Sequence, residues 1–159
     1  MNISIIAIGK LKEKYWQDAV KEYSKRLGAY CKLQIIELKE SPLPANPSAA
    51  DEEAVKRAEG TEILSKISKG DYVNTLEIKG KSFSSEALAS KIEELGIEGK
   101  SSLVFVIGGS LGLSKEVSER ADFKLSFSAM TFPHQMMRVI LLEQIYRSFK
   151  IIRNETYHK

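Results

Sequence analysis

The segment Gly108-Gly109-Ser110-Leu111-Gly112 has residue types and spacing that could support chemistry. It follows an apolar run at 103–107 that is typical of a buried strand. Its pattern is G-x-S-x-G, which can present a nucleophilic serine on a sharp turn between a strand and a helix. Asp122 and His134 follow Ser110 in the chain order of a hydrolase triad. A serine hydrolase is therefore one hypothesis, although the chain is short for that class and lacks an upstream oxyanion segment of the HGGG type.

The same glycines favour a second hypothesis, a ligand-binding loop. A backbone without Cβ atoms can approach a bound molecule closely. The segment is not G-x-G-x-x-G and lacks the Lys-Ser/Thr pair of phosphate-cradling loops, which argues against a dinucleotide or ATP site. Two other loops follow expected strands, after Leu76 and after Phe127. Because ligands bind at the carboxyl ends of the strands in an open α/β sheet, the three loops together predict a small-molecule site.

Histidine and cysteine are scarce in this chain. The two histidines are His134 and His158, and Cys31 is the only cysteine, so neither a disulfide framework nor a metal centre is expected. His134 stands at the start of a helix, where a capping role is favoured over a base or a ligand contact. The polar tail holds Tyr157 and His158. It is either an untethered terminus or, docked on a neighbouring subunit, a source of base stacking and proton transfer.

Hydrophobic patterning predicts the elements that position these residues. Apolar runs favour strands at 3–8, 31–38, 72–78, 103–107 and 124–127, and helical spacing favours helices at 12–27, 48–67, 84–96 and after Pro133. Gly60 counts against the second helix, because glycine is a poor helix former. Strands that alternate with helices imply parallel crossovers. We therefore expect one α/β domain over residues 1–159, with a mostly parallel sheet flanked by helices.

The helix after Pro133 is unusually apolar. One row at i,i+4 spacing consists of Met137, Leu141, Ile145 and Phe149, and a second apolar face holds Met136 and Ile140. Thr131 is placed to cap this helix. A helix that is apolar on more than one face is buried in its own core or between two subunits. A homodimer interface is favoured, and a central core helix is the alternative.

Composition excludes only a few classes of function. The chain of 159 residues is 43% hydrophobic and 28% charged, with a net charge of +3. Lysine and arginine gather at 10–32 and from 134 onward, where they could touch phosphate or form ordinary solvated helix faces. No apolar run reaches the length of a membrane span, and the run at 3–8 lacks the flanks of a signal peptide. A cytoplasmic location is expected.

Several segments taken together resemble one known family. They are FVIGGSLG at 105–112, LSFSAMTFPHQMMR at 125–138 and YHK at 157–159, with IGKLK at 8–12 and Tyr15. These segments are similar to the bacterial SPOUT methyltransferases that modify N3 of a pseudouridine in 23S rRNA. The resemblance covers essentially the whole chain. It implies an α/β sheet whose C-terminal part is threaded into a trefoil knot, an exception to the rule that protein chains are not knotted.

The resemblance also implies a cofactor, partners and site residues. The family uses S-adenosylmethionine, and its contacts correspond here to Leu76, Gly108, Phe127, Ser128, Ala129, Met130, Thr131 and Phe132. The family acts as a homodimer through its C-terminal helix, on 23S rRNA in the assembled ribosome, without a metal or a membrane. Tyr157 and His158 from the partner subunit are the expected catalytic residues, and Arg138 is expected to bind substrate. A catalytically silent ribosome-binding factor of the same fold is the alternative.

Overall fold

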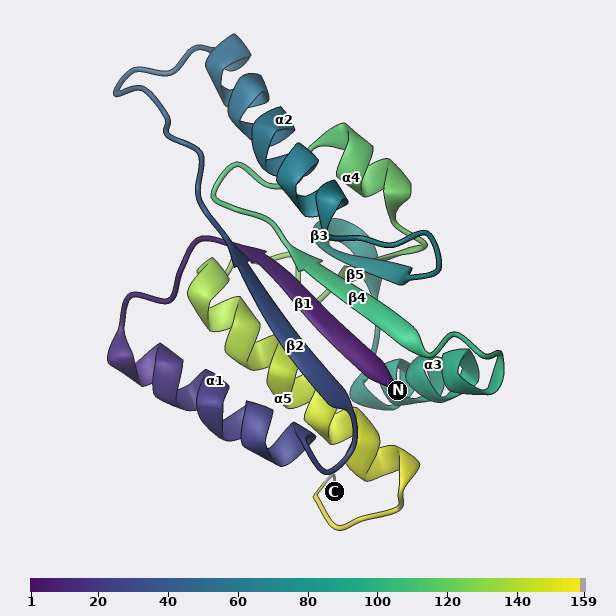
Figure 1. Cartoon of the computed structure of the whole chain (residues 1–159). Coiled ribbons are helices and arrows are strands. Elements are labelled where there is room, and N and C mark those ends of the chain that lie inside the picture. The colour runs from purple at the N-terminus through teal and green to yellow at the C-terminus, as the bar shows by residue number, and fades with distance from the viewer. Residues whose placement is uncertain (158–159) are drawn as a thin grey trace.

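A five-stranded sheet forms the centre of the structure, a computed structural model that describes residues 1–157 (Figure 1). Its strands are β1 (Asn2–Ile8), β2 (Lys32–Leu38), β3 (Tyr72–Ser82), β4 (Ser102–Ile107) and β5 (Phe123–Ser126). They lie in the order β2-β1-β4-β3-β5, and every neighbouring pair is parallel. The predicted α/β class with a mostly parallel sheet is confirmed.

Five helices cover the two faces of this sheet. They are α1 (Lys14–Leu27), α2 (Ala49–Ser65), α3 (Ser85–Ile97), α4 (Lys115–Arg120) and α5 (His134–Ile152). Helices α1, α5 and α3 lie on one face with α5 in the middle, while α2 and α4 lie on the other (Figure 1). None of the helices in the described part of the chain is both long and apolar enough to cross a membrane.

The two central strands are buried on both faces. On β1, Ile3 and Ile5 point into the core beneath α5, whereas Ile6 and Ile8 point into the core beneath α2 and α4. Strand β4 divides its side chains in the same way. Such strands read as nearly continuous apolar runs because neither face meets water. Their burial holds the carboxyl ends of the strands at one fixed edge.

Serine side chains begin three of the helices. Ser48, Ser84 and Ser114 each accept a hydrogen bond from a backbone N–H in the first turn of α2, α3 and α4. Helix α5 instead begins after Pro133 and has no side-chain cap. The predicted cap by Thr131 is therefore wrong. Thr131 lies two residues before the cap position, on the loop that leads into the helix.

Helix α5 packs inside its own chain along one face. Leu141, Ile145 and Phe149 are buried in the core on the sheet, between α1 and α3. The i,i+4 row that favoured a subunit contact thus fills the core of the same chain instead. The second apolar face, with Met136 and Ile140, is only partly buried.

Gly60 marks the place where α2 crosses α4. A Cβ atom at this position would lie 2.3 Å from the Ser114 hydroxyl oxygen and 3.4 Å from a methyl carbon of Val117. No side chain fits there without movement of α4. The conflict between Gly60 and helical propensity is therefore resolved by close helix packing, which the residue pattern alone does not reveal.

Replacing Gly60 tests this crossing. On helix propensity alone, Gly60→Ala would stabilise the protein by roughly 1 kcal/mol. We expect the opposite, a loss of about 1–3 kcal/mol in the free energy of unfolding measured in urea, because the methyl group overpacks against Ser114. Gly70→Ala is the control, since a Cβ atom there has no neighbour within 4 Å. Equal stability of the two variants would contradict the prediction.

Candidate functional site

A cavity of about 730 Å³ opens at the carboxyl edge of the sheet. Three segments line it, at 76–78, 107–113 and 125–134, and Met137 of α5 completes the wall. The second and third segments end or follow β4 and β5, where the loops of an open α/β sheet are expected to hold a ligand, whereas 76–78 lies within β3, where its pairing with β5 shifts register. The volume is that of an ordinary small-molecule site.

The glycine-rich loop after β4 forms a tight turn in the cavity wall. Gly112 donates its N–H to the carbonyl of Gly109 over 3.1 Å and has φ +82°, a value that L-side chains rarely adopt. A Cβ atom on Gly108 would lie 3.0 Å from the Gly112 carbonyl carbon and 3.0 Å from a methyl of Leu113. The turn therefore leaves no room for a side chain at Gly108 in this part of the cavity wall.

Most of the residues that the resemblance assigns to the cofactor come together around this cavity. Those in its wall are Leu76, Gly108, Phe127, Ser128, Met130, Thr131 and Phe132. Ala129 belongs to the same loop but is exposed and is not part of the wall. The Ser126 hydroxyl donates to the carbonyl of Ile78 over 2.9 Å and so fastens this loop to β3. The role of these residues as cofactor contacts stays a prediction.

The sequence patterns missed Glu77 and His134 as wall residues. Among the described residues that line the cavity, Glu77 is the only carboxylate. It accepts hydrogen bonds from the Thr75 hydroxyl at 2.7 Å and from the Ser118 hydroxyl at 3.0 Å, so it is held in one orientation. His134 had been favoured as a capping residue. The position of each residue next to a ligand loop was the available signal.

The carboxylate of Glu59 lies behind the glycine-rich loop. Its side chain is buried, and it accepts a hydrogen bond from the backbone N–H of Ser41 at 3.0 Å. Burial raises the pKa of this carboxyl group above its usual value. A Cβ atom on Gly109 would come within 3.1 Å of the second carboxylate oxygen of Glu59.

Within residues 1–157, no three side chains of the metal-ligating types gather closely enough to hold a metal ion.

The hydrolase hypothesis is wrong, because its triad is dispersed. Ser110 follows β4 at the carboxyl edge of the sheet, whereas Asp122 precedes β5 at the amino edge. The Asp122 carboxylate accepts from the backbone N–H of Val73 at 2.8 Å and from the Arg120 guanidinium at 3.0 Å. In a parallel sheet these two edges are separated by the full length of the strands. The serine is a loop residue.

Arg138 lies inside the protein, with 1% of its surface exposed. Its guanidinium donates to the Glu37 carboxylate at 2.6 Å and to the carbonyls of Ile8 at 2.9 Å and Gly9 at 2.6 Å. Burial lowers the pKa of Arg138, and the nearby Glu37 carboxylate opposes that shift. The expected substrate-binding role does not fit this enclosed position. Arg138 instead connects the second turn of α5 to the ends of β1 and β2.

Tyr157 packs against the side of α5, away from the cavity of its own chain. Its hydroxyl donates to Glu143 at 3.3 Å, its ring meets Tyr146 edge to face, and the Arg147 guanidinium lies 4.7 Å from its centroid. Glu143 is six residues, about 9 Å, along the helix from Met137, the nearest wall residue on α5. Burial raises the pKa of Tyr157 to about 12. His158 lies outside the described residues.

A family model described as "Predicted SPOUT methyltransferase" matches residues 1–158. The chain belongs to the SPOUT methyltransferase family. Its relatives include the ribosomal RNA large subunit methyltransferase H of Clostridium novyi (strain NT), 59% identical over 159 residues, and that of Clostridium acetobutylicum, 57% identical over 159 residues. Both alignments cover 100% of both chains.

A solved structure shows the same fold at much lower sequence identity. It is described as a probable methylase family protein from Haemophilus influenzae Rd KW20 and superposes with a TM-score of 0.55 at 14% identity. The match covers 99% of this chain and 70% of the other. As a member of the SPOUT family, the protein is a methyltransferase and requires a methyl donor.

Arg138→Met tests the buried connection. Removal of the guanidinium leaves Glu37 and two carbonyls without their donor, so the free energy of unfolding should fall by about 2–4 kcal/mol. Arg138→Lys should lose less, because it keeps the charge without the planar fork. Lys115→Met is the control at an exposed ion pair and should change stability by less than about 0.5 kcal/mol. A loss at Arg138 no larger than at Lys115 would refute the prediction.

Proposed function

We propose that this protein transfers a methyl group from S-adenosylmethionine to N3 of a pseudouridine in the large-subunit 23S rRNA of the assembled ribosome. The main observation in support is the cavity that three segments form at the carboxyl edge of the sheet in this SPOUT methyltransferase. The printed names of the full-length relatives support large-subunit rRNA as the substrate. A ribosomal substrate also places the protein in the cytoplasm. The trefoil threading of the C-terminal segment stays part of this proposal.

The cavity wall suits an adenosyl group. Leu76, Leu125 and Phe127 offer apolar surface for the faces of a flat adenine ring. The glycine-rich loop offers backbone N–H and C=O groups for the edge of such a ring. The fixed carboxylate of Glu77 suits a ribose hydroxyl or the ammonium group of the methionine part. These residues fit the cofactor without a metal.

In this proposal, Tyr157 and His158 of the tail have different roles in the reaction. When bound, S-adenosylmethionine supplies an electrophilic methyl group on a positively charged sulfur. The protein must align N3 with that methyl group and accept the N3 proton. Tyr157, whose pKa is raised to about 12, is protonated, and its hydroxyl orients the base once its hydrogen bond to Glu143 is exchanged for one to the base. We assign the role of proton acceptor to His158, because histidine is the side chain type best suited to move a proton near neutral pH.

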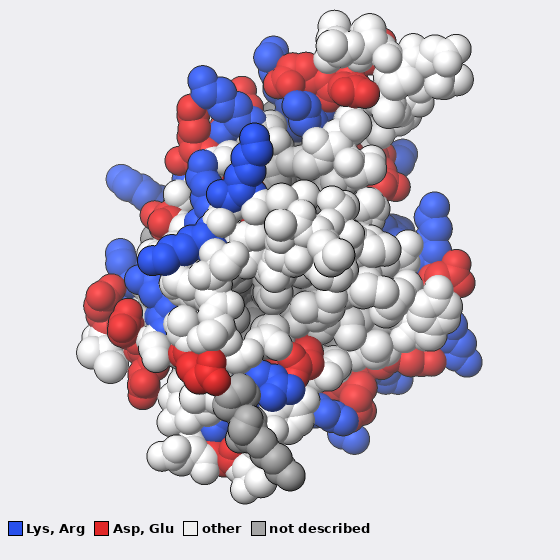
Figure 2. Space-filling model, turned by 180° about the vertical axis from the view of Figure 1, so that it is seen from behind, with Lys and Arg blue, Asp and Glu red and all other residues white. Residues whose placement is uncertain are grey.

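A homodimer completes the site in this proposal. Tyr157 packs on α5 at a distance from its own cavity, so the tail must serve the cavity of a second subunit. The second apolar face of α5 supplies the contact, with Met136, Val139 and Ile140 only partly buried. Figure 2 shows the side of the molecule on which α5 lies, and a broad area there carries no charged side chain. Such an area is typical of a subunit interface.

Gly108→Ala tests the donor site and the reaction together. The added methyl group displaces the tight turn, so we expect calorimetry to show an affinity for S-adenosylmethionine at least about 10-fold weaker, with an unchanged circular dichroism spectrum. Ribosomes from cells that lack the protein are then incubated with each enzyme and cofactor. Mass spectrometry of rRNA fragments should find one new methyl group on a pseudouridine with the wild type and far less with the variant.

Gly70→Ala is the matched control, because its Cβ atom meets no neighbour within 4 Å and the residue lies outside the cavity wall. It should behave as the wild type in both measurements. Ribosome binding by the wild type without any methyl transfer would favour a catalytically silent binding factor and sink the proposal. Normal cofactor affinity of Gly108→Ala would show that the donor lies elsewhere.

Deleting residues 157–159 tests the role of the tail. Turnover should fall by at least about 100-fold, the usual contribution of a positioned proton acceptor, while cofactor affinity stays within about 2-fold. Mixed dimers sharpen the test. Each subunit type is impaired alone at a limiting cofactor concentration, but a dimer of one truncated subunit and one Gly108→Ala subunit holds one intact donor cavity served by one intact tail. Activity should therefore return on mixing. No recovery would place the tail in its own chain's site.

A further inference from the structure

Three lysines stand on the two strands that contribute to the cavity wall: Lys79 and Lys81 on β3, and Lys124 on β5. We call them the lysine cluster. All three are exposed. Lys79 directly follows Ile78, and Lys124 directly precedes Leu125, and both of these neighbours line the cavity. Because β5 is the outermost strand and pairs with β3, the cluster borders the cavity at the open side of the sheet.

The charge of the lysine cluster is not neutralised by the described part of its own chain. Lys79 and Lys124 have no hydrogen bond or ion pair within residues 1–157, and the Lys81 ammonium only lies 5.4 Å from the centroid of the Phe83 ring. The nearby carboxylates are engaged elsewhere. Glu77 binds the hydroxyls of Thr75 and Ser118, and Asp122 binds Arg120 and the backbone of Val73.

Three other lysines are each paired with a carboxylate. Lys56 pairs with Glu53, Lys115 with Glu119, and Lys150 with Glu155. Figure 2 shows lysine and arginine side chains gathered in a band beside the broad uncharged area. A group of unpaired ammonium groups at the margin of a site attracts and positions an anionic substrate.

The backbone beneath the lysine cluster is held firmly. The pairing of β3 with β5 shifts register between Leu76 and Lys81, both of which pair with Leu125. The residues between them bulge from the sheet, and a Cβ atom on Gly80 would lie 2.7 Å from the carbonyl oxygen of Lys124. The hydrogen bond from Ser126 to Ile78 fastens the same bulge. Bulges of this kind redirect side chains next to active sites.

Two exposed apolar side chains complete the cavity rim. Ile78 is 53% exposed and Met130 is 73% exposed, although both are large and apolar. An RNA strand presents charged phosphates and flat bases in alternation. Unpaired ammonium groups match the phosphates, and an apolar rim matches the face of a base that has left its stack.

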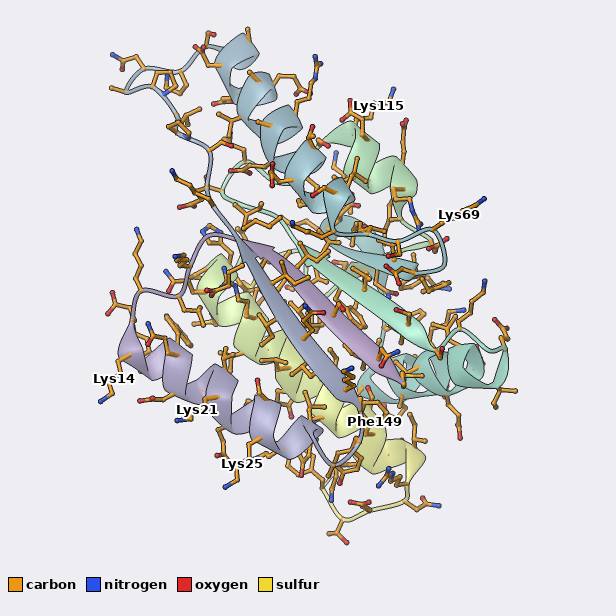
Figure 3. All side chains as sticks on the ribbon, in the orientation of Figure 1. Lys14, Lys21, Lys25, Lys69, Lys115 and Phe149 are labelled. Carbon is orange, nitrogen blue, oxygen red and sulfur yellow. The ribbon has the colours of Figure 1, made fainter. Side chains whose placement is uncertain are left out.

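We propose that Lys79, Lys81 and Lys124 bind the phosphates of the RNA segment that carries the target base, with Ile78 and Met130 beneath an unstacked base. The proposal rests on the function proposed above and names the side of the cavity from which the RNA enters. It assigns RNA binding to the lysines at the β3–β5 edge and not to the other unpaired lysines of the protein. Figure 3 shows Lys14, Lys21 and Lys25 projecting from the outer side of α1, away from the sheet.

The test compares two variants that each lose three positive charges. The cluster variant carries Lys79→Gln, Lys81→Gln and Lys124→Gln. The control carries Lys21→Gln, Lys25→Gln and Lys69→Gln, on α1 and on the segment before β3, all exposed and all outside the cavity wall. Methyl transfer is measured against ribosome concentration, and ribosome binding is measured between 50 and 200 mM salt, on the order of the range in which phosphate contacts are resolved.

The cluster variant should show a KM for ribosomes at least about 10-fold higher, with kcat within about 2-fold and cofactor affinity unchanged. The slope of log affinity on log salt should become shallower by about 2, since each lost contact to single-stranded RNA removes about 0.7. The control should match the wild type. A third variant with arginine at the three cluster positions keeps the charge and should retain activity, which separates lost charge from lost folding.

Two results would overturn the lysine cluster as the RNA contact. One is a cluster variant with the KM and salt slope of the wild type, and the other is a control that loses affinity instead. Failure of the proposed function is seen separately, because the wild type itself would then transfer no methyl group. In that case the salt dependence of ribosome binding alone decides whether the cluster binds RNA.

Discussion

The buried guanidinium of Arg138 is the contact on which the edge of the site depends. It reaches the carbonyls of Ile8 and Gly9 and the carboxylate of Glu37, so it joins α5 to the ends of two strands. Pro133 and His134, in the cavity wall, lie within two turns of the same helix start. Their position therefore follows from this one interaction. An arginine suits the task because its planar fork serves several acceptors at once and its charge persists even where burial lowers its pKa.

The cavity lies at the end of rigid strands, and a tight glycine-rich turn forms part of its wall. The strands beneath it are buried on both faces, which leaves their carboxyl ends little freedom. The glycine-rich loop then brings the main chain to the ligand where a side chain would collide. One chain forms this cavity but holds Tyr157 at Glu143, more than one and a half helical turns beyond Met137 of the cavity wall. In the proposed enzyme, one subunit holds the methyl donor and its partner supplies the groups that act on the base.

Charge matters here through its placement. A net charge of +3 is small for a protein that binds nucleic acid, and several lysines are neutralised by neighbouring carboxylates. The lysine cluster differs because the acids around it are already bound by hydroxyls, an arginine or backbone. A protein of this size covers few nucleotides, so a few well-placed contacts must combine with the shape of the ribosome to select one base.

Residue patterns alone determined the strands, most helix limits and the parallel sheet, because hydrophobic period and crossover length are local properties. They also indicated the loop after β4, since a strand that runs into glycines ends there, and the family resemblance named residues that the structure brings into the cavity wall. The expected end of the third strand at Ile78 was wrong, because β3 continues through a bulge to Ser82. Tertiary structure decided the rest. It placed Leu141 and Ile145 in the core of their own chain, buried Arg138 beside Ile8, separated Asp122 from Ser110 and explained Gly60 by its contact with Ser114. Each of these outcomes depends on residues that are distant in the chain. The type of a side chain, apolar or charged, does not indicate which distant surface will cover it.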